Sequence, residues 1–137
     1  NADVIELLVQ SARTYIYTTA LPPAIAEAVR EALRIVRAED DRRIELFARV
    51  REFRKGAGAL GLPVTASETP IQPLILGSAE RAVAASEHLR RRGILVPAIR
   101  PPTVPDGSAR LRITFSSAHR PAHVERLLEA LAGIPGE

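Results

Sequence analysis

The sequence predicts an α+β fold, in which a helical arm precedes a small, mostly antiparallel sheet with helices packed on one face. Apolar residues in the first sixty positions recur every three or four residues, the period of an amphipathic helix. Residues 110–115 alternate between polar and apolar side chains, which is typical of a half-buried strand. After residue 60 the expected order is strand, helix, strand, strand, helix. We therefore divide the chain into an arm (1–60) and a small domain (61–137).

The arm is expected to begin with a short helix capped by Asp3. Residues 15–20 are rich in β-branched and aromatic side chains, which favour extended chain. Pro22 and Pro23 then open a longer helix, because proline is tolerated in the first helical turn. The apolar face of that helix carries Ile25, Val29, Leu33 and Val36.

A second long helix completes the arm. Its apolar face carries Leu46, Val50, Phe53, Ala57 and Leu60. The acidic run 39–41 either interrupts the helical pattern or lies on its exposed side. Glycines at 56, 58 and 61 weaken the end of this helix, and Pro63 stops it.

The small domain is expected to open on a strand over residues 71–76. Pro73 lacks a backbone donor, so this strand lies at an edge or contains a bulge. A helix over residues 79–92 follows, with Ala82, Ala85 and Leu89 facing inward. A second strand is expected over residues 94–99.

A turn and a last helix complete the small domain. Pro105-Asp106-Gly107 is a strong turn signal before the strand at 110–115. The last helix presents Val124, Leu127, Leu128 and Leu131 on one face. Gly133 and Pro135 end it.

Composition excludes several classes of protein. Apolar residues make up 46% and charged residues 26%, the balance of a soluble globular domain. There is no cysteine, which excludes disulfides and cysteine-ligated metal sites and fits a cytoplasmic location. No apolar run approaches the roughly 20 residues of a membrane helix. A net charge of +3 with 4% aromatic residues is a weak signal for nucleic acid, so we expect neither a nucleic acid nor a membrane as partner.

No self-contained catalytic constellation is visible. The three histidines, His88, His119 and His123, lack the carboxylate pattern of a metal site, so we expect no metal and favour capping and surface roles. Arg110 and Arg112 share one face of a strand and either line a cleft or face water.

A proline-rich segment carries the most unusual pattern. Residues 97–105 hold four prolines, which fix a loop at low entropic cost, and one arginine, Arg100. A guanidinium in a rigid loop suits a site that grips a carboxylate through two parallel hydrogen bonds. An ordinary surface arginine fits the same pattern.

Residues 98–114, followed by Ala118-His119, resemble the C-terminal signature of the 8-amino-7-oxononanoate synthases. These belong to the α-oxoamine synthases, pyridoxal-phosphate (PLP) enzymes of aspartate-aminotransferase fold type I. Residues 17–23 and 70–75 resemble two further segments of the same family, so the resemblance covers nearly the whole chain. Relatives that make 5-aminolevulinate or 2-amino-3-oxobutyrate usually lack the Ile-Arg-Pro-Pro-Thr run at 99–103.

The resemblance implies an acyltransferase of biotin biosynthesis. Such an enzyme condenses L-alanine with pimeloyl-CoA or a pimeloyl carrier protein, releases carbon dioxide, and works as a cytoplasmic homodimer with PLP. The alternatives are another α-oxoamine synthase that uses glycine and an acyl-CoA, or a non-enzymatic, basic α+β binding module.

The resemblance also implies roles for individual residues. Arg100 matches the family arginine that binds the substrate carboxylate, and Thr103 matches a residue lining the substrate site. Thr18 and Thr19 match a hydroxyl pair that contacts the PLP phosphate of the neighbouring subunit. The lysine that holds PLP as a Schiff base has no counterpart, because the lone lysine, Lys55, matches nothing catalytic.

It follows that the segment contains no catalytic residue. It corresponds to the C-terminal third of such an enzyme, with the arm leading from the large PLP domain. We expect the segment alone to be inactive and to bind no PLP.

Overall fold

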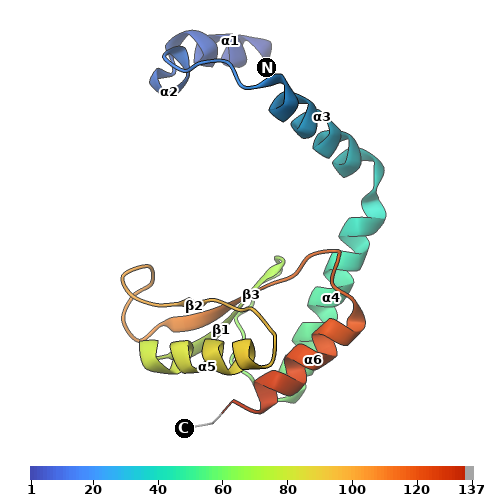
Figure 1. The fold of residues 1–137 in the computed structure, drawn as a ribbon, viewed down its shortest axis with the longest axis vertical. Coiled ribbons are helices and arrows are strands. Elements are labelled where there is room, and N and C mark those ends of the chain that lie inside the picture. The colour runs from blue at the N-terminus through green and yellow to red at the C-terminus, as the bar shows by residue number, and fades with distance from the viewer. Residues whose placement is uncertain (135–137) are drawn as a thin grey trace. The chain divides into compact units, whose positions relative to one another are not determined.

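The computed structural model describes residues 1–134 and divides into two compact units (Figure 1). The helical unit is Asn1–Glu39 and the sheet unit is Asp40–Glu137. Pro135, expected to help end the last helix, lies outside the described residues. The observed division falls after Glu39, whereas the sequence suggested one after residue 60. The reason is that the helix following Glu39 packs into the core of the sheet unit.

The helical unit contains α1 (Ala2–Ser11), α2 (Arg13–Ile16) and α3 (Pro23–Ala38). The cap of α1 is Asn1 rather than Asp3: the Asn1 side-chain oxygen accepts a hydrogen bond from the Asp3 backbone amide at 2.9 Å. Tyr15 and Ile16, expected to be extended, form a single helical turn whose amides donate to the Ala12 carbonyl. Their strand preference has no effect here, since β propensity depends on packing against a neighbouring strand.

The helix α3 follows the sequence pattern closely. It starts at Pro23, in the first-turn position that proline favours, and ends at Ala38, where Glu39 leaves helical geometry. Of the acidic run, Glu39 therefore interrupts the helical pattern, and Asp40 and Asp41 form the first turn of the next helix. The four apolar residues of its predicted face are between 50% and 55% exposed, namely Ile25, Val29, Leu33 and Val36.

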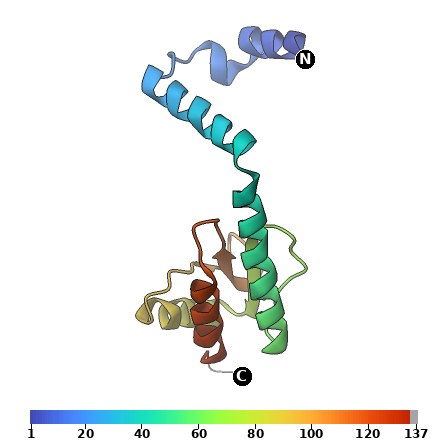
Figure 2. The same cartoon turned by 90° about the vertical axis from the view of Figure 1, so that its right-hand side faces the viewer.

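The sheet unit combines three helices with a three-stranded antiparallel sheet (Figures 1 and 2). Its elements are α4 (Asp40–Ala59), β1 (Ile71–Gly77), α5 (Ala79–Arg91), β2 (Ala98–Ile99), β3 (Ala109–Thr114) and α6 (Pro121–Ala132). The strand order is β1-β3-β2, with Leu74 opposite Leu111 and Ile99 opposite Arg110. The expected α+β class and element order are confirmed.

The strand β1 lies at an edge of this sheet, as Pro73 predicted. Its outer side carries hydrogen bonds from Thr65 N to Pro73 O (3.2 Å) and from Ile75 N to Pro63 O (3.1 Å). Backbone groups of Pro73 therefore point away from β3, so its missing donor removes no bond of the ladder.

The strand β2 is shorter than expected, because residues 94–97 are not strand. The Val96 carbonyl accepts from the Ser86 hydroxyl at 2.6 Å instead of joining the sheet. Pro97 has no amide to donate, and its carbonyl alone accepts, from Arg112 N at 3.0 Å. Pairing with β3 therefore covers just Ala98 and Ile99.

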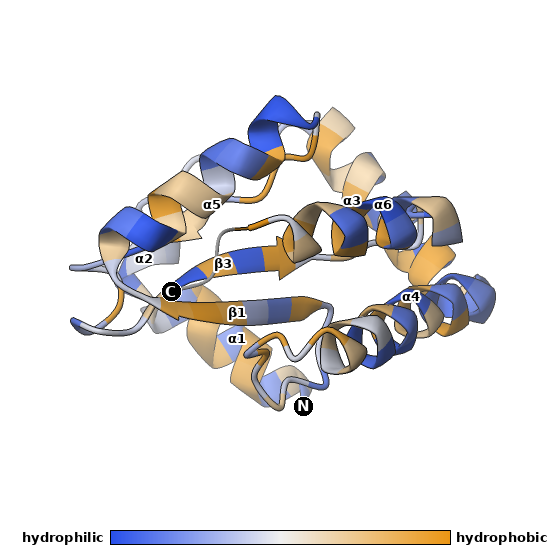
Figure 3. Cartoon of the chain, turned by 90° about the horizontal axis from the view of Figure 1, so that it is seen from below, coloured by the Kyte–Doolittle hydropathy of each residue, from blue (hydrophilic) through white to orange (hydrophobic). Residues whose placement is uncertain are grey.

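One continuous core joins the sheet to the three helices. Alternate residues of β3, namely Ala109, Leu111 and Ile113, are buried, and Figure 3 shows hydrophobic and hydrophilic residues alternating along that strand. Phe53 of α4 packs against Phe115, with ring centroids 5.3 Å apart. α4 and α6 lie side by side (Figure 2), and a Cβ added at Gly56 would stand 2.2 Å from the Leu128 side chain. A side chain at position 56 would therefore have to displace the end of the Leu128 side chain.

Candidate functional site

The loop between β2 and β3 carries the main candidate, Arg100, directly after the strand. The Arg100 carbonyl accepts a hydrogen bond from Thr103 N at 3.0 Å, so the first half of the loop closes into a turn. At the other end, the Ser108 hydroxyl donates to the Pro105 carbonyl at 2.6 Å. Gly107, with φ of 73°, supplies the left-handed position that this second turn needs. Local bonds therefore fix both ends of the loop.

The Arg100 guanidinium is exposed and makes no hydrogen bond or ion pair with any residue from 1 to 134. All of its donors are available to an anion, and a guanidinium offers a carboxylate two parallel, charge-assisted hydrogen bonds. Thr103 is also exposed, and its hydroxyl makes no hydrogen bond within the same residues. The structure brings these two predicted residues together in one turn.

The sequence did not decide whether Arg110 and Arg112 line a cleft or face water. In the structure the two side chains have different surroundings. Arg110 is half-buried and donates from Nε to the Ser108 carbonyl at 2.9 Å, which ties the loop to β3. Arg112 is exposed and lines a groove at the far end of β3 from Arg100. Sequence analysis did not anticipate this groove, because its walls come from segments distant in the chain.

Thr18 and Thr19 lie in the helical unit, between α2 and α3. The Thr18 hydroxyl donates to the Tyr15 carbonyl at 2.7 Å, so its own hydrogen is already committed. The Thr19 hydroxyl is exposed and makes no hydrogen bond within residues 1–134. Neither side chain caps α3, whose N-cap is Pro22. Thr19 is thus the member of the pair with a free donor.

Each of the three histidines contacts a backbone group, His119 and His123 within their own turn and His88 across the fold. His88 Nε2 lies 3.2 Å from the Ala130 carbonyl, at the end of α6. His119 Nδ1 accepts from Ser116 N at 2.9 Å, and His123 Nδ1 accepts from Arg120 N at 3.2 Å. Within residues 1–134, no group of three or more His, Cys, Asp or Glu side chains could hold a metal ion.

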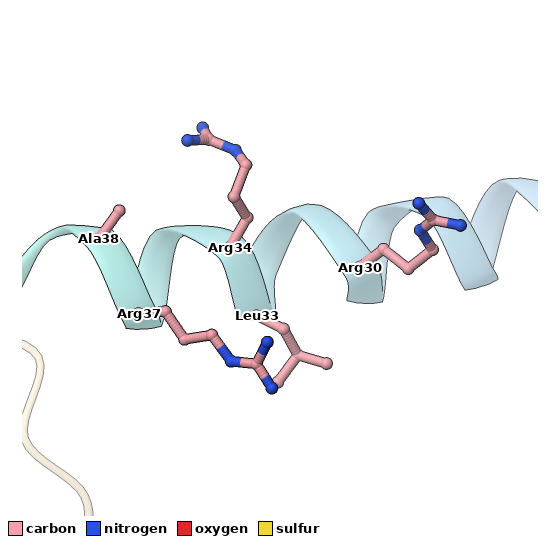
Figure 4. A pocket seen from close by; sticks show the side chains of 5 residues that line it. All are labelled: Arg30, Leu33, Arg34, Arg37 and Ala38. Carbon is pink, nitrogen blue, oxygen red and sulfur yellow. The ribbon is translucent and has the colours of Figure 1, made fainter.

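A shallow hollow on α3, drawn in Figure 4, has a volume of about 430 Å³. Its lining residues all come from one helix: Arg30, Leu33, Arg34, Arg37 and Ala38. Arg34 is also paired with Glu31 at 2.6 Å. Since a single helix provides no opposing wall, we assign no site to this hollow. No helix among the described residues is long and apolar enough to cross a membrane.

Known proteins resemble the chain over nearly all of its length. The 8-amino-7-oxononanoate synthase of Thioalkalivibrio sulfidiphilus is 61% identical over 128 residues, covering 93% of this chain and 33% of that protein. The enzyme of the same name from Stutzerimonas stutzeri is 58% identical over 132 residues, covering 96% and 34%. The chain thus spans about a third of the length of these relatives. They confirm the resemblance drawn from residues 98–114.

Solved structures agree with this relationship. The 8-amino-7-oxononanoate synthase of Francisella tularensis superimposes with a TM-score of 0.81 at 31% identity, covering 96% of this chain and 38% of that one. A serine palmitoyltransferase from Sphingomonas wittichii superimposes with a TM-score of 0.88 at 27% identity, covering 95% of this chain and 33% of that one. The family profile described as aminotransferase class I and II matches residues 1–131. The chain therefore belongs to the aminotransferase class I and II family.

Proposed function

We propose that this chain forms the C-terminal part of a PLP-dependent 8-amino-7-oxononanoate synthase, and that its sheet unit is the small domain of a fold-type-I enzyme. The observation that carries the proposal is an identity of 58–61% to proteins of that name over more than nine-tenths of the chain. The proposed reaction joins the α-carbon of L-alanine to the acyl carbon of a pimeloyl thioester. Carbon dioxide and the thiol leave.

Arg100 is the proposed carboxylate-binding residue. Its guanidinium is exposed, carries no internal partner among residues 1–134, and stands on a loop closed at both ends by hydrogen bonds. Two parallel hydrogen bonds from it would fix both the position and the plane of a substrate carboxylate. Thr103, in the same turn, would line the substrate site.

PLP is the proposed cofactor, and the residues present fit a contact to its phosphate. The free hydroxyl of Thr19 can donate to a phosphate oxygen, whereas the Thr18 hydroxyl already donates to Tyr15. In such enzymes the cofactor supplies the electron sink for carbanion chemistry. We propose that Thr19 makes this contact across a homodimer interface, in a cytoplasmic enzyme.

A different amino-acid substrate is the second candidate, since serine palmitoyltransferases share the fold at a TM-score of 0.88. Their identity of 27% is far below the 61% of the first relative, which favours alanine over other amino acids. Comparing turnover of alanine, glycine and serine with a pimeloyl thioester separates the two candidates. Higher turnover with glycine or serine would overturn the assignment.

The test of Arg100 uses the protein carrying both this chain and the lysine-bearing portion. We expect Arg100→Gln to weaken use of alanine by about 2–4 kcal/mol, because the carboxylate loses a bidentate, charge-assisted contact. Arg91→Gln, an exposed arginine on α5, is the matched control and should leave kcat/KM unchanged. An unchanged alanine dependence in Arg100→Gln would remove Arg100 from the site. The 137-residue chain alone should form no product.

A further inference from the structure

A groove of about 670 Å³ lies beside the C-terminal end of β3, at the opposite end of that strand from the Arg100 loop. Its walls come from residues 93–97, from residues 112–115, and from His119 with the first turns of α6. The volume is within the range of small-molecule sites, roughly 300–1,000 Å³. None of the residues of the Arg100 loop lines it, so the two features share no lining residue.

The groove has a mixed lining of basic and apolar side chains. Its charged and ionisable side chains are Arg112, His119, His123 and Arg126, and no Asp or Glu is among the described residues that line it. Its apolar wall includes Ile94, Val96 and Pro97. A mixed lining of this kind suits a ligand with an anionic group and an organic body.

Backbone hydrogen bonds hold both imidazoles in a fixed orientation. His119 Nδ1 accepts from Ser116 N, and His123 Nδ1 accepts from Arg120 N. When Nδ1 is the acceptor, the neutral ring carries its proton on Nε2, so each ring keeps Nε2–H as a donor. The two rings lie edge to face with centroids 6.0 Å apart. Two oriented donors therefore stand close together in the lining of the groove.

Two arginines add further donors to the lining of the groove. Arg112 is exposed, on the face of β3 opposite the core, and makes no side-chain hydrogen bond within residues 1–134. Arg126 donates a hydrogen bond from Nη2 to the Arg92 carbonyl, which leaves its other N–H groups available. The groove also borders the N-terminal turns of α6, where the helix dipole favours negative charge.

We propose that this groove binds a phosphate ester, with the phosphate held by Arg112, His119 and His123 and the organic part against the apolar wall. A phosphate presents three oxygens to several converging donors, whereas a carboxylate presents two. The inference concerns the groove alone and does not rest on the proposed synthase activity.

The test is a titration of the full 137-residue chain, followed by amide NMR shifts, with three probes. Coenzyme A carries phosphate and an organic chain, inorganic phosphate carries the anion alone, and pantetheine carries the organic chain alone. We expect saturable shifts at residues 112–115 and at His119 and His123, with coenzyme A binding more tightly than phosphate. Equal affinity for phosphate and coenzyme A would refute the organic part of the proposal. Equal affinity for pantetheine would refute the phosphate part.

Two variants and one control make the assignment specific. Arg112→Gln removes one charge, and His123→Glu adds a negative charge while keeping an acceptor three residues into the helix, where glutamate suits a helix cap. Each should weaken coenzyme A binding about tenfold or more. Arg51→Gln removes the same charge from the exposed side of α4 and should change nothing. The groove is not a phosphate-ester site if Arg112→Gln and His123→Glu bind coenzyme A as tightly as the Arg51→Gln control does. The same conclusion follows if the wild-type chain shows no saturable shift.

Discussion

The helices α3 and α4 both carry a row of apolar residues at helical spacing, but the centre of the row is buried in α4 alone. In α3 the apolar face is half exposed, with Val29 and Leu33 both at 52%. In α4, Val50 is 3% exposed and Phe53 is 0% exposed. Both faces repeat every three or four residues, so periodicity does not distinguish them. The difference is that α4 has α6 and the sheet as packing partners within its own unit.

The two helices are stabilised by different kinds of interaction. Proline at the first turn and pairs such as Glu31–Arg34 support α3 locally, while none of its residues is buried. α4 contributes buried side chains to a core shared with α5, α6 and β3, so its stability is tertiary. An amphipathic pattern therefore specifies a face of a helix, and another part of the structure has to cover it.

The largest expected effect comes from deleting a buried ring. Phe53→Ala should cost about 3–5 kcal/mol of unfolding free energy, because Phe53 is fully buried against Phe115. Val29→Ala on the exposed face of α3 should stay within about 0.5 kcal/mol. Urea unfolding followed by circular dichroism measures both. Similar losses for the two variants would mean that α3 is as well packed as α4.

A polar network joins α4 to the segment before β1 and provides the next test. Arg54 Nη1 donates to the Thr65 and Ser67 carbonyls and to Gln72 Oε1, and Gln72 is fully buried. Arg54→Leu should cost about 1–3 kcal/mol, because a buried acceptor loses its donor. Arg51→Leu, three residues earlier on the exposed side, should be near neutral in the same urea measurement. Equal stability of the two variants would contradict a structural role for the network.

A smaller effect distinguishes two glycines of α4. A Cβ at Gly56 would press on the Leu128 side chain, whereas one at Gly58 meets nothing within 4 Å. Gly56→Ala should therefore destabilise by about 1 kcal/mol, after the gain in helix propensity, while Gly58→Ala should stabilise by up to about 1 kcal/mol. Leu128→Ala should relieve the clash, so the Gly56→Ala and Leu128→Ala effects should be non-additive. Strict additivity would argue against close packing of α4 on α6.

The smallest expected effect concerns an exposed ion pair on α5. Arg90 donates two hydrogen bonds to Glu87, and this lowers the pKa of the Glu87 carboxyl below its ordinary value of 4.5. A lowered folded pKa means that the small stabilisation is present above pH 4.5 and disappears as the pH falls through the folded value. NMR titration should show the Glu87 pKa returning upward in Arg90→Gln. An unchanged pKa would show that the pair does not form in solution.

Sequence reasoning identified the sheet unit best where local signals and packing agree. The alternation at 110–115, the turn at Pro105–Gly107 and the edge position of Pro73 are all confirmed. The strand predicted over 94–99 is confirmed at Ala98 and Ile99 but wrong at 94–97, where the Ser86 hydroxyl donates to the Val96 carbonyl. Sequence reasoning also erred at Tyr15 and Ile16, whose strand propensity finds no neighbouring strand.

Of the two candidate sites, one could be predicted from the sequence and the other could not. The Arg100 loop is local, so its prolines and turn residues, together with the family resemblance, singled it out. The groove escaped notice, because His119, Arg112 and residues 93–97 meet through tertiary packing alone.

The sequence by itself determined the family, the longer helices and their apolar faces, and the stiff loop that holds Arg100, since proline, glycine and residue periodicity act over a few residues. Tertiary structure decided which faces are buried, placed α4 in the sheet unit, and assembled the basic groove. The physical reason is range: turns and helices depend on neighbours in the chain, whereas burial and binding surfaces depend on segments that meet through folding.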